Sequence, residues 1–269
     1  MVRSVWQQRI GRANELASRF PFVAEILRFY AAIVQFQSSL FDLLERACDG
    51  LEPPVREPFS GPPELPELLA RFPAFLSMVE RAGPAPLAHS AKELSECSAA
   101  FWSRLLSDYW AGPDPEIGEV GPHQFFARAF LQPYAEFVCS RVNPKPEGST
   151  HPLCPFCSRR PGLGVLRPMG DGGKRSLVCS FCLTEWEFRR IVCPGCGEED
   201  HRNLPVYTAE ELEHVRVECC DRCKRYIKTV DLTKSGLADP VVDEIASLPL
   251  DLWAQERGYS KLQSNHMQL

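Results

Sequence analysis

The sequence predicts an α+β fold in which an N-terminal helical bundle precedes two small antiparallel β modules of the rubredoxin or zinc-ribbon type. Apolar residues recur at three- and four-residue steps in the first part of the chain, which is the period of amphipathic helices. Nine of the twelve cysteines then fall between Cys154 and Cys223. We therefore expect a helical domain at residues 1–148, metal modules at residues 149–190 and 191–231, and a C-terminal helical segment and tail at residues 232–269.

Three apolar stripes predict the main helices of the first domain. A capping box formed by Ser90 and Glu93 is expected to start the second helix. Prolines between residues 53 and 66 predict a long loop, residues 143–150 predict a linker, and the polar residues 260–269 are expected to be disordered. The stripes are Phe22, Ile26, Leu27, Tyr30, Ile33, Val34, Leu40 and Leu44, with Gln37 as a polar interruption, then Leu94, Cys97, Phe101, Leu105 and Tyr109, and finally Phe126, Phe130, Tyr134 and Phe137.

Composition and charge favour a protein of the cytoplasm. The formal net charge is -5, so no overall basic field draws the chain to nucleic acid or to an anionic membrane. No window approaches the roughly 18 uninterrupted apolar residues of a membrane span, and the charged first twenty residues do not fit a secretion signal. We expect no membrane partner. Thiols in a reducing cytoplasm seldom persist as disulfides, so clustered cysteines there indicate metal binding.

Eight of the clustered cysteines form four Cys-x-x-Cys pairs. Two residues between thiols allow one tight turn to direct both sulfurs at the same ion, so each pair is half of a tetrahedral site. The intervals between successive pairs hold 21, 10 and 23 residues, which predicts one site from the first two pairs and another from the last two. Pairing of the outer turns with each other, and of the inner turns with each other, stays open. The predicted ligands are Cys154, Cys157, Cys179 and Cys182 for one ion and Cys193, Cys196, Cys220 and Cys223 for the other.

Such sites favour a structural protein over an enzyme. An ion held by four thiolates has no open position with which to activate water, so we expect no catalytic residues. Each module buries too little apolar surface to fold by itself, so metal ligation should supply much of its stability. Redox-active dithiols are the alternative explanation of the pairs.

The remaining cysteines and the nearby histidines are not expected to be ligands. Cys219 has no pair, and it stays open whether it substitutes as a ligand, reacts as an exposed thiol or has no role. Solvated or hydrogen-bonding roles are predicted for three histidines, and inert positions on the helices for three cysteines. These residues are His151, His201 and His214, and Cys48, Cys97 and Cys139.

The cysteine-rich part resembles the formate dehydrogenase accessory protein family FdhE. The resemblance rests on residues 179–186 (CSFCLTEW), 189–193 (RRIVC) and 220–228 (CDRCKRYIK), and it continues to about residue 260. It implies a helical domain followed by two rubredoxin-like modules, with iron as the bound metal and zinc as the alternative. It also implies a partner, the catalytic subunit of a molybdenum- or tungsten-dependent formate dehydrogenase, contacted before export. Ser158 stands where the family has glycine, in a turn that favours positive φ.

Other assignments follow from single segments. Glu185 and Trp186 come directly after a metal turn, so we expect them to bind a partner, with packing of Trp186 between modules as the alternative. Two further functions stay open, a rubredoxin-like electron carrier and a nucleic-acid-binding ribbon protein. The second rests on the basic residues Arg159, Arg160, Arg167, Lys174, Arg175, Arg189 and Arg190.

Overall fold

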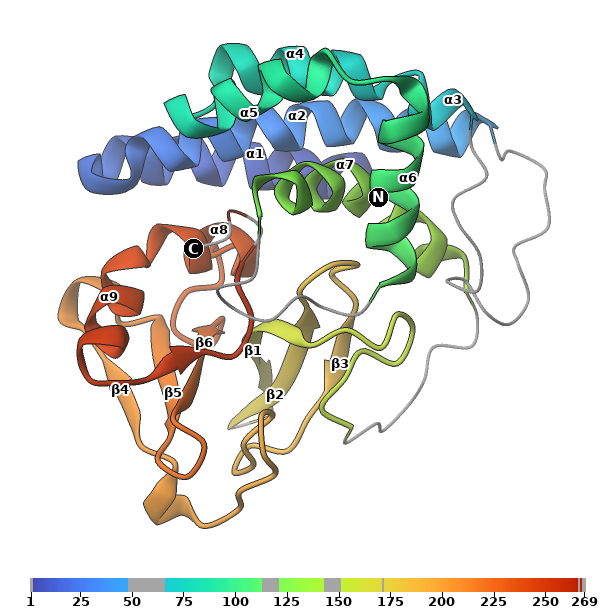
Figure 1. Ribbon diagram of the computed structural model, residues 1–269. Coiled ribbons are helices and arrows are strands. Elements are labelled where there is room, and N and C mark those ends of the chain that lie inside the picture. Colours follow the sequence, from blue (N-terminus) through green and yellow to red (C-terminus); the bar gives the residue numbers. More distant parts are fainter. Residues whose placement is uncertain are drawn as a thin grey trace. The chain divides into compact units, whose positions relative to one another are not determined.

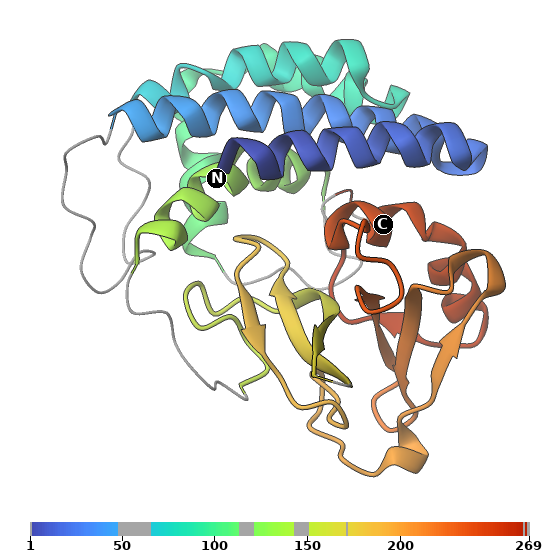
Figure 2. The same cartoon turned by 180° about the vertical axis from the view of Figure 1, so that it is seen from behind.

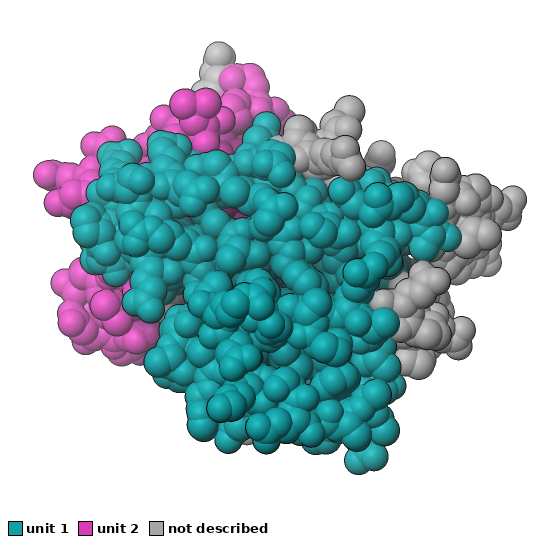
Figure 3. Space-filling view, turned by 90° about the horizontal axis from the view of Figure 1, so that it is seen from above, with its two compact units in different colours: residues 1–144 teal, residues 145–269 magenta. Residues whose placement is uncertain are grey.

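The structure is a computed structural model that describes residues 2–47, 66–112, 121–142, 151–170, 172–265 and 267. The chain divides into two compact units, Met1–Pro144 and Lys145–Leu269, which Figure 3 colours teal and magenta. The expected loop at residues 53–65, the expected linker at 143–150 and Cys48 lie outside the described residues. None of the described helices combines the length and the apolar character that crossing a bilayer would require.

Helices make up the first unit, as the apolar periodicity predicts. The first two long helices lie side by side in both ribbon views (Figure 1 and Figure 2). The helices are α1 (Val2–Arg19), the short 3-10 turn η1 (Pro21–Val23), α2 (Ala24–Ala47), α3 (Pro66–Leu69), α4 (Phe72–Ala82), α5 (Ala85–Ser95), α6 (Ala99–Ala111) and α7 (Pro122–Arg141).

Aromatic side chains from α4 and α7 fill the core of this unit. Phe72, Phe75 and Phe130 are buried, and the ring centroids of Phe72 and Phe130 lie 4.9 Å apart in an edge-to-face arrangement. Gln37, the polar interruption of the first stripe, is buried as well, and its Nε2 donates a hydrogen bond to the Ala129 carbonyl at 2.7 Å. This bond joins α2 to α7 and satisfies a polar group that would otherwise be costly to bury.

The second predicted stripe belongs to two helices. Helix α5 ends at Ser95 and α6 begins at Ala99, and Ser98 caps α6 by accepting a hydrogen bond from the Phe101 amide at 3.3 Å. The predicted capping box is wrong, because Ser90 is buried inside α5. Only residues 96–98 separate the two helices, so the three- and four-residue spacing of apolar residues continues from one helix into the next and does not show the boundary in the sequence.

One mixed sheet carries both cysteine modules in the second unit. Its strand order is β3-β2-β1-β6-β5-β4, and β7 pairs with β6. Along this order the neighbours within each half are antiparallel, whereas β1 and β6 run parallel and join the halves. β7 also pairs with β6 in parallel. The sequence had indicated two separate sheets. The strands are β1 (Pro161–Met169), β2 (Gly172–Cys179), β3 (Glu185–Glu187), β4 (Val206–Thr208), β5 (Val215–Cys220), β6 (Arg225–Asp231) and β7 (Ser260–Lys261).

A glycine permits the parallel pairing between the two halves. Gly164 on β1 lies opposite Thr229 on β6, and a Cβ atom at Gly164 would collide with the Thr229 side chain. The close backbone approach at the centre of the sheet therefore requires a residue without a side chain.

Two helices follow the sheet and pack on it. α8 (Pro240–Ala246) contacts β6 and β1, and α9 (Leu248–Glu256) follows directly. Asp239 caps α8, because its Oδ1 accepts hydrogen bonds from the Val241 and Val242 amides at 3.0 Å each. The predicted C-terminal helical segment is therefore divided into two short helices.

The chain end is ordered, so the prediction of disorder over residues 260–269 is wrong for the described residues 260–265 and 267. Residues 261–265 are buried, and β7 pairs with β6 in parallel. Lys261 and Asn265 of this segment have buried partners, which is why a polar sequence is ordered here. Asn265 Nδ2, for example, donates a hydrogen bond to Glu244 Oε2 at 2.9 Å.

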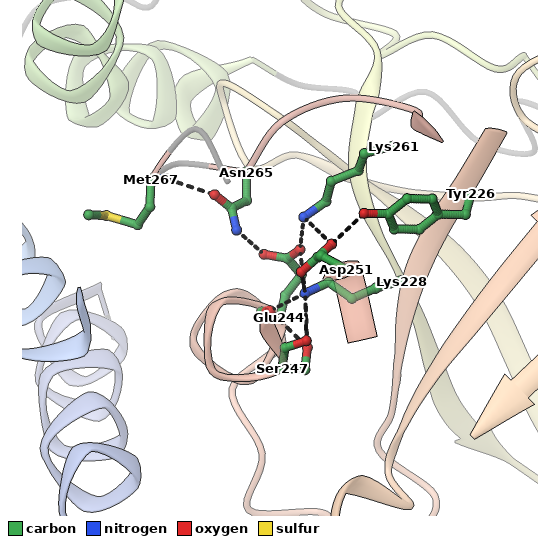
Figure 4. Close-up of polar contacts among 8 residues, drawn as sticks. All are labelled: Tyr226, Lys228, Glu244, Ser247, Asp251, Lys261, Asn265 and Met267. Carbon is green, nitrogen blue, oxygen red and sulfur yellow. Dashed lines mark hydrogen bonds and ion pairs between the residues drawn. The ribbon is translucent and has the colours of Figure 1, made fainter. Parts of the chain in front are cut away.

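Four buried charges, which we call the buried tetrad, hold the chain end (Figure 4). Lys228 Nζ lies 3.1 Å from Glu244 Oε1 and 2.5 Å from Asp251 Oδ2. Lys261 Nζ lies 2.6 Å from Glu244 Oε1 and 2.9 Å from Asp251 Oδ1. Burial alone would raise the pKa of Glu244, but the two ammonium groups lower it to about 2, so the carboxylate stays ionised at neutral pH. The two positive and two negative charges cancel.

Replacement of one member of the buried tetrad should destabilise the second unit strongly. Lys228→Met leaves Glu244 and Asp251 with one ammonium group instead of two, and we expect the free energy of unfolding to fall by about 3 to 5 kcal/mol. Urea unfolding followed by far-UV circular dichroism measures the change. The exposed Lys234→Met is the matched control and should change stability by less than about 0.5 kcal/mol. Equal stability of the two variants would contradict a structural role for the tetrad.

Candidate metal centres

All four Cys-x-x-Cys turns share one backbone conformation. In each turn the residue after the second cysteine has positive φ, a left-handed conformation that a side chain disfavours. In three of the turns the amide of that residue donates a hydrogen bond to the carbonyl of the first cysteine, at 2.8 to 3.0 Å. The expected positive φ at Ser158 is therefore confirmed. The four residues are Ser158 (58°), Leu183 (53°), Gly197 (74°) and Lys224 (56°).

The first cluster joins the first and second turns. The sulfur atoms of Cys154, Cys157, Cys179 and Cys182 all lie within 4.8 Å of one another. Cys157 Sγ is 3.3 Å from Cys179 Sγ and 3.6 Å from Cys182 Sγ, and Cys154 Sγ is 3.5 Å from Cys182 Sγ. The Phe181 amide donates a hydrogen bond to Cys179 Sγ at 3.4 Å, which offsets negative charge on that sulfur.

The second cluster joins the third and fourth turns. Its sulfur atoms also lie within 4.8 Å of one another, with Cys193 Sγ 3.7 Å from Cys223 Sγ and Cys196 Sγ 3.6 Å from Cys220 Sγ. The Gly195 amide donates to Cys193 Sγ at 3.3 Å. Cys196 is exposed, so this cluster is more open to solvent than the first. The pairing predicted from the interval lengths is confirmed, and the cross-pairing of outer and inner turns is not found.

The donor set fits a tetrahedral metal ion. Metal–sulfur bonds of about 2.3 Å would place tetrahedral sulfurs about 3.8 Å apart, close to the separations in both clusters. A disulfide would need about 2.05 Å, and all eight cysteines are free. Hydrogen bonding to the Cys154 thiol and to two other thiols raises the pKa of Cys157, and burial raises the pKa of Cys223 to about 11. The thiols of Cys157 and Cys223 therefore hold their protons at neutral pH unless a cation replaces them.

Among the residues that the structure describes, the other cysteines and the histidines belong to neither cluster. Cys219 is 3% exposed, and burial raises the pKa of its thiol to about 12, so it does not offer an exposed reactive thiol. Cys139 is buried, and the Cys97 thiol contacts the Glu93 carbonyl at 3.6 Å. The nitrogen atoms of His151, His201 and His214 contact the Leu153 amide at 3.2 Å, Asp200 at 3.8 Å and Asp243 at 2.7 Å.

Glu185 and Trp186 both have partners inside the second unit. Trp186 is 4% exposed, and its Nε1 donates a hydrogen bond to the His151 carbonyl at 3.0 Å. Arg167 donates to both carboxylate oxygens of Glu185, at 2.7 to 3.1 Å. Packing explains the position of Trp186 without a partner. Binding of a partner by these two residues stays a prediction.

The basic residues beside the first cluster are mostly engaged within the protein. Four of the seven form ion pairs, and a fifth, Arg159, lies over the Phe181 ring with its guanidinium carbon 4.2 Å from the centroid. To bind nucleic acid, these basic groups would have to be exposed and to face a phosphate backbone. The ion pairs are Arg167–Glu185 and Lys174–Glu187 at 2.7 Å, and Arg175–Glu218 and Arg189–Glu199 at 2.6 Å.

Arg175 connects the two modules, a role that the sequence did not reveal. The side chain is buried on β2, and its Nη2 lies 2.6 Å from Glu218 Oε2 on β5. Its Nη1 donates to the Arg189 carbonyl at 2.8 Å, in the segment that leads to the second cluster. A charged residue inside a strand is a weak signal, and nothing local identifies a partner 43 residues away.

Comparison with known proteins identifies the class. Family models match this chain at residues 153–190, "FdhE, central domain", and at residues 191–268, "FdhE, C-terminal domain". The "Protein FdhE homolog" of Aquifex aeolicus is 28% identical over 96% of this chain and 93% of its own length, and that of Edwardsiella ictaluri is 27% identical over 98% and 88%. The crystal structure of the FdhE protein from Pseudomonas aeruginosa matches 99% of this chain and 96% of its own, with a TM-score of 0.69 and 25% identity.

A helical unit followed by a mixed sheet with two four-cysteine clusters therefore defines the class of protein. The chain belongs to the FdhE family.

Loss of one thiol should empty one cluster and leave the other filled. Cys182→Ser removes a thiolate from the first cluster, so we expect bound metal to fall from two equivalents per chain to one. Elemental analysis of purified protein measures this ratio. Cys219→Ser is the control and should retain both equivalents, because Cys219 belongs to neither cluster. Two equivalents in Cys182→Ser would show that the first cluster does not hold an ion through that sulfur.

The turns also allow a test of backbone strain. Gly197 has a φ of 74°, and a Cβ atom added there would have no atom within 4 Å. Gly197→Ala should therefore lower the free energy of unfolding by about 1 kcal/mol, because of the positive φ and not because of a steric clash. Ser158→Gly should raise it by about 0.5 kcal/mol, because relief of the strained φ exceeds the entropy cost of glycine. Thermal unfolding of metal-loaded protein measures both. Gly236→Ala, outside the left-handed region, is the control and should not lower stability.

Proposed function

We propose that this chain is an accessory protein for the maturation of a molybdenum- or tungsten-dependent formate dehydrogenase. In this proposal it acts in the cytoplasm, binds the catalytic subunit before export and has no catalytic activity of its own. The observation that carries the proposal is the presence of two four-thiol clusters in a chain of the FdhE family.

The proposed metal ligands are the eight cysteines of the two clusters. Thiolate sets of this kind accept iron and zinc, and the family resemblance favours iron. A bound ion would cross-link two turns that are 22 to 30 residues apart in the sequence. With four sulfurs around it, such an ion has no position for a substrate, which supports a binding role over hydrolysis.

A second candidate function is electron transfer. It is favoured by one feature of the second cluster, the exposure of Cys196, since an exposed ligand shortens the path of an electron to a partner. It requires iron, because zinc has no redox chemistry.

Metal content and partner binding together test the proposal. Protein purified without oxygen should contain two metal equivalents, and a red, reducible protein would identify iron.

The tagged chain should co-purify the catalytic subunit of formate dehydrogenase from its own host, whereas Cys182→Ser and Cys223→Ser should retain at most a tenth of it because a module unfolds. Cys97→Ser, in the helical unit and outside both clusters, is the control. Failure of the unaltered chain to retain the catalytic subunit would refute the accessory function.

A further inference from the structure

A cavity of about 350 Å³ lies beside the second cluster, within the second unit. Its walls come from the turn at residues 193–195, from strands β5 and β6 and from the segment that leads to the cluster. The volume lies at the lower end of the roughly 300 to 1,000 Å³ that is usual for ligand pockets.

Apolar side chains line the cavity, and two of them are exposed. Ile191 is 56% exposed and Val206 is 51% exposed, although isolated exposure of such residues is unfavourable. Both border the same cavity, so they form an apolar patch continuous with it. Leu262 is buried and closes another wall.

The charged side chains of the cavity wall are mostly basic, although the whole chain is acidic. Its charged lining residues comprise four arginines and one glutamate. Arg175 pairs with Glu218 and Arg216 pairs with Asp231, at 2.6 and 2.7 Å. Arg190 and Arg225 form no ion pair with any described residue. Arg225 lies beside Cys193, since a Cβ atom at Gly195 would lie 3.6 Å from both side chains, so it faces the negative charge that four thiolates around a divalent ion would carry. The exposed Arg190 is left for an occupant to match.

The chain end builds part of this cavity, and the buried tetrad holds it there. Lys261 lies between Glu244 and Asp251 (Figure 4), and the next residue, Leu262, donates its amide to the Tyr226 carbonyl at 2.8 Å. Leu262 packs so closely on the metal turn that a Cβ atom at Gly195 would lie 3.1 Å from its Cδ1. The cavity therefore has a preorganised wall.

We propose that this cavity is the docking site for a segment of the catalytic subunit in which an apolar side chain is flanked by Asp or Glu. The proposal rests on the proposed function and adds the place and the chemistry of the contact. The apolar side chain enters the cavity against Ile191 and Leu262, and a flanking carboxylate meets Arg190. An apolar anchor surrounded by a charged rim is the usual composition of a binding hot spot.

Matched substitutions at the rim test the proposal. Arg190→Glu reverses one rim charge and Ile191→Ser removes an exposed apolar group, and both positions are exposed, so folding should be retained. Lys234→Glu and Leu252→Ser make the same chemical changes at exposed positions of this unit that do not line the cavity. Binding of each full-length variant to the purified catalytic subunit is measured by biolayer interferometry at 50 and 300 mM KCl. Metal content and circular dichroism confirm that each variant is folded.

We expect Kd to rise at least tenfold for Arg190→Glu and for Ile191→Ser, and to change less than twofold for the two controls. Added salt should weaken binding of the unaltered chain more than that of Arg190→Glu, since one attractive charge is gone in the variant. A set of 15-residue peptides covering the catalytic subunit should bind only where an apolar residue has acidic neighbours.

The outcomes separate the two proposals. Unchanged affinity of both rim variants, with the subunit still bound, would overturn the docking site and leave the accessory function in place. Loss of affinity in Ile191→Ser alone would overturn the acidic character of the occupant. Absence of binding by the unaltered chain would overturn both proposals.

Discussion

Bringing four sulfur atoms within 4.8 Å of one another places strict demands on the backbone around them. Each turn must reverse within a few residues, and it does so through a left-handed residue directly after the second cysteine. Backbone amides then face the sulfurs, as the amides of Phe181 and Gly195 do. Four thiolates held this way repel one another. A cation at the centre replaces this repulsion by four metal–sulfur bonds, so the cluster then stabilises the module.

The sheet makes the two clusters parts of one body. The parallel pairing of β1 with β6 depends on Gly164, and the ion pair of Arg175 with Glu218 spans the same junction. Because both clusters lie on this sheet, they are connected through hydrogen-bonded strands and not through a flexible tether. This chain thus differs from a string of independent zinc ribbons joined by linkers.

Local features of the sequence were enough to predict that the first unit is helical, with stripes that match α2 and α7, and to predict the composition of both clusters. The period of the apolar residues and the spacing of the cysteine pairs are both visible within windows of a few residues. What escaped prediction depends on residues far apart in the chain. The break before Ser98, the joining of the two sheets, and the partners of Lys228 and Lys261 are set by tertiary contacts, and a polar segment such as residues 260–265 looks like a tail until those contacts are known.

The alternation of charge in the buried tetrad has a consequence for how the chain end finds its position. If β7 slipped by one residue along β6, Leu262 would face Glu244 and Asp251, and the ammonium group of Lys261 would lose both carboxylates. Two buried carboxylates would then share one ammonium group, that of Lys228, and one negative charge would be left without a partner in the interior. Strand β7 consequently has a single favourable alignment on β6. Because β7 is short, its hydrogen bonds are too few to select this alignment, and the charges of the buried tetrad select it.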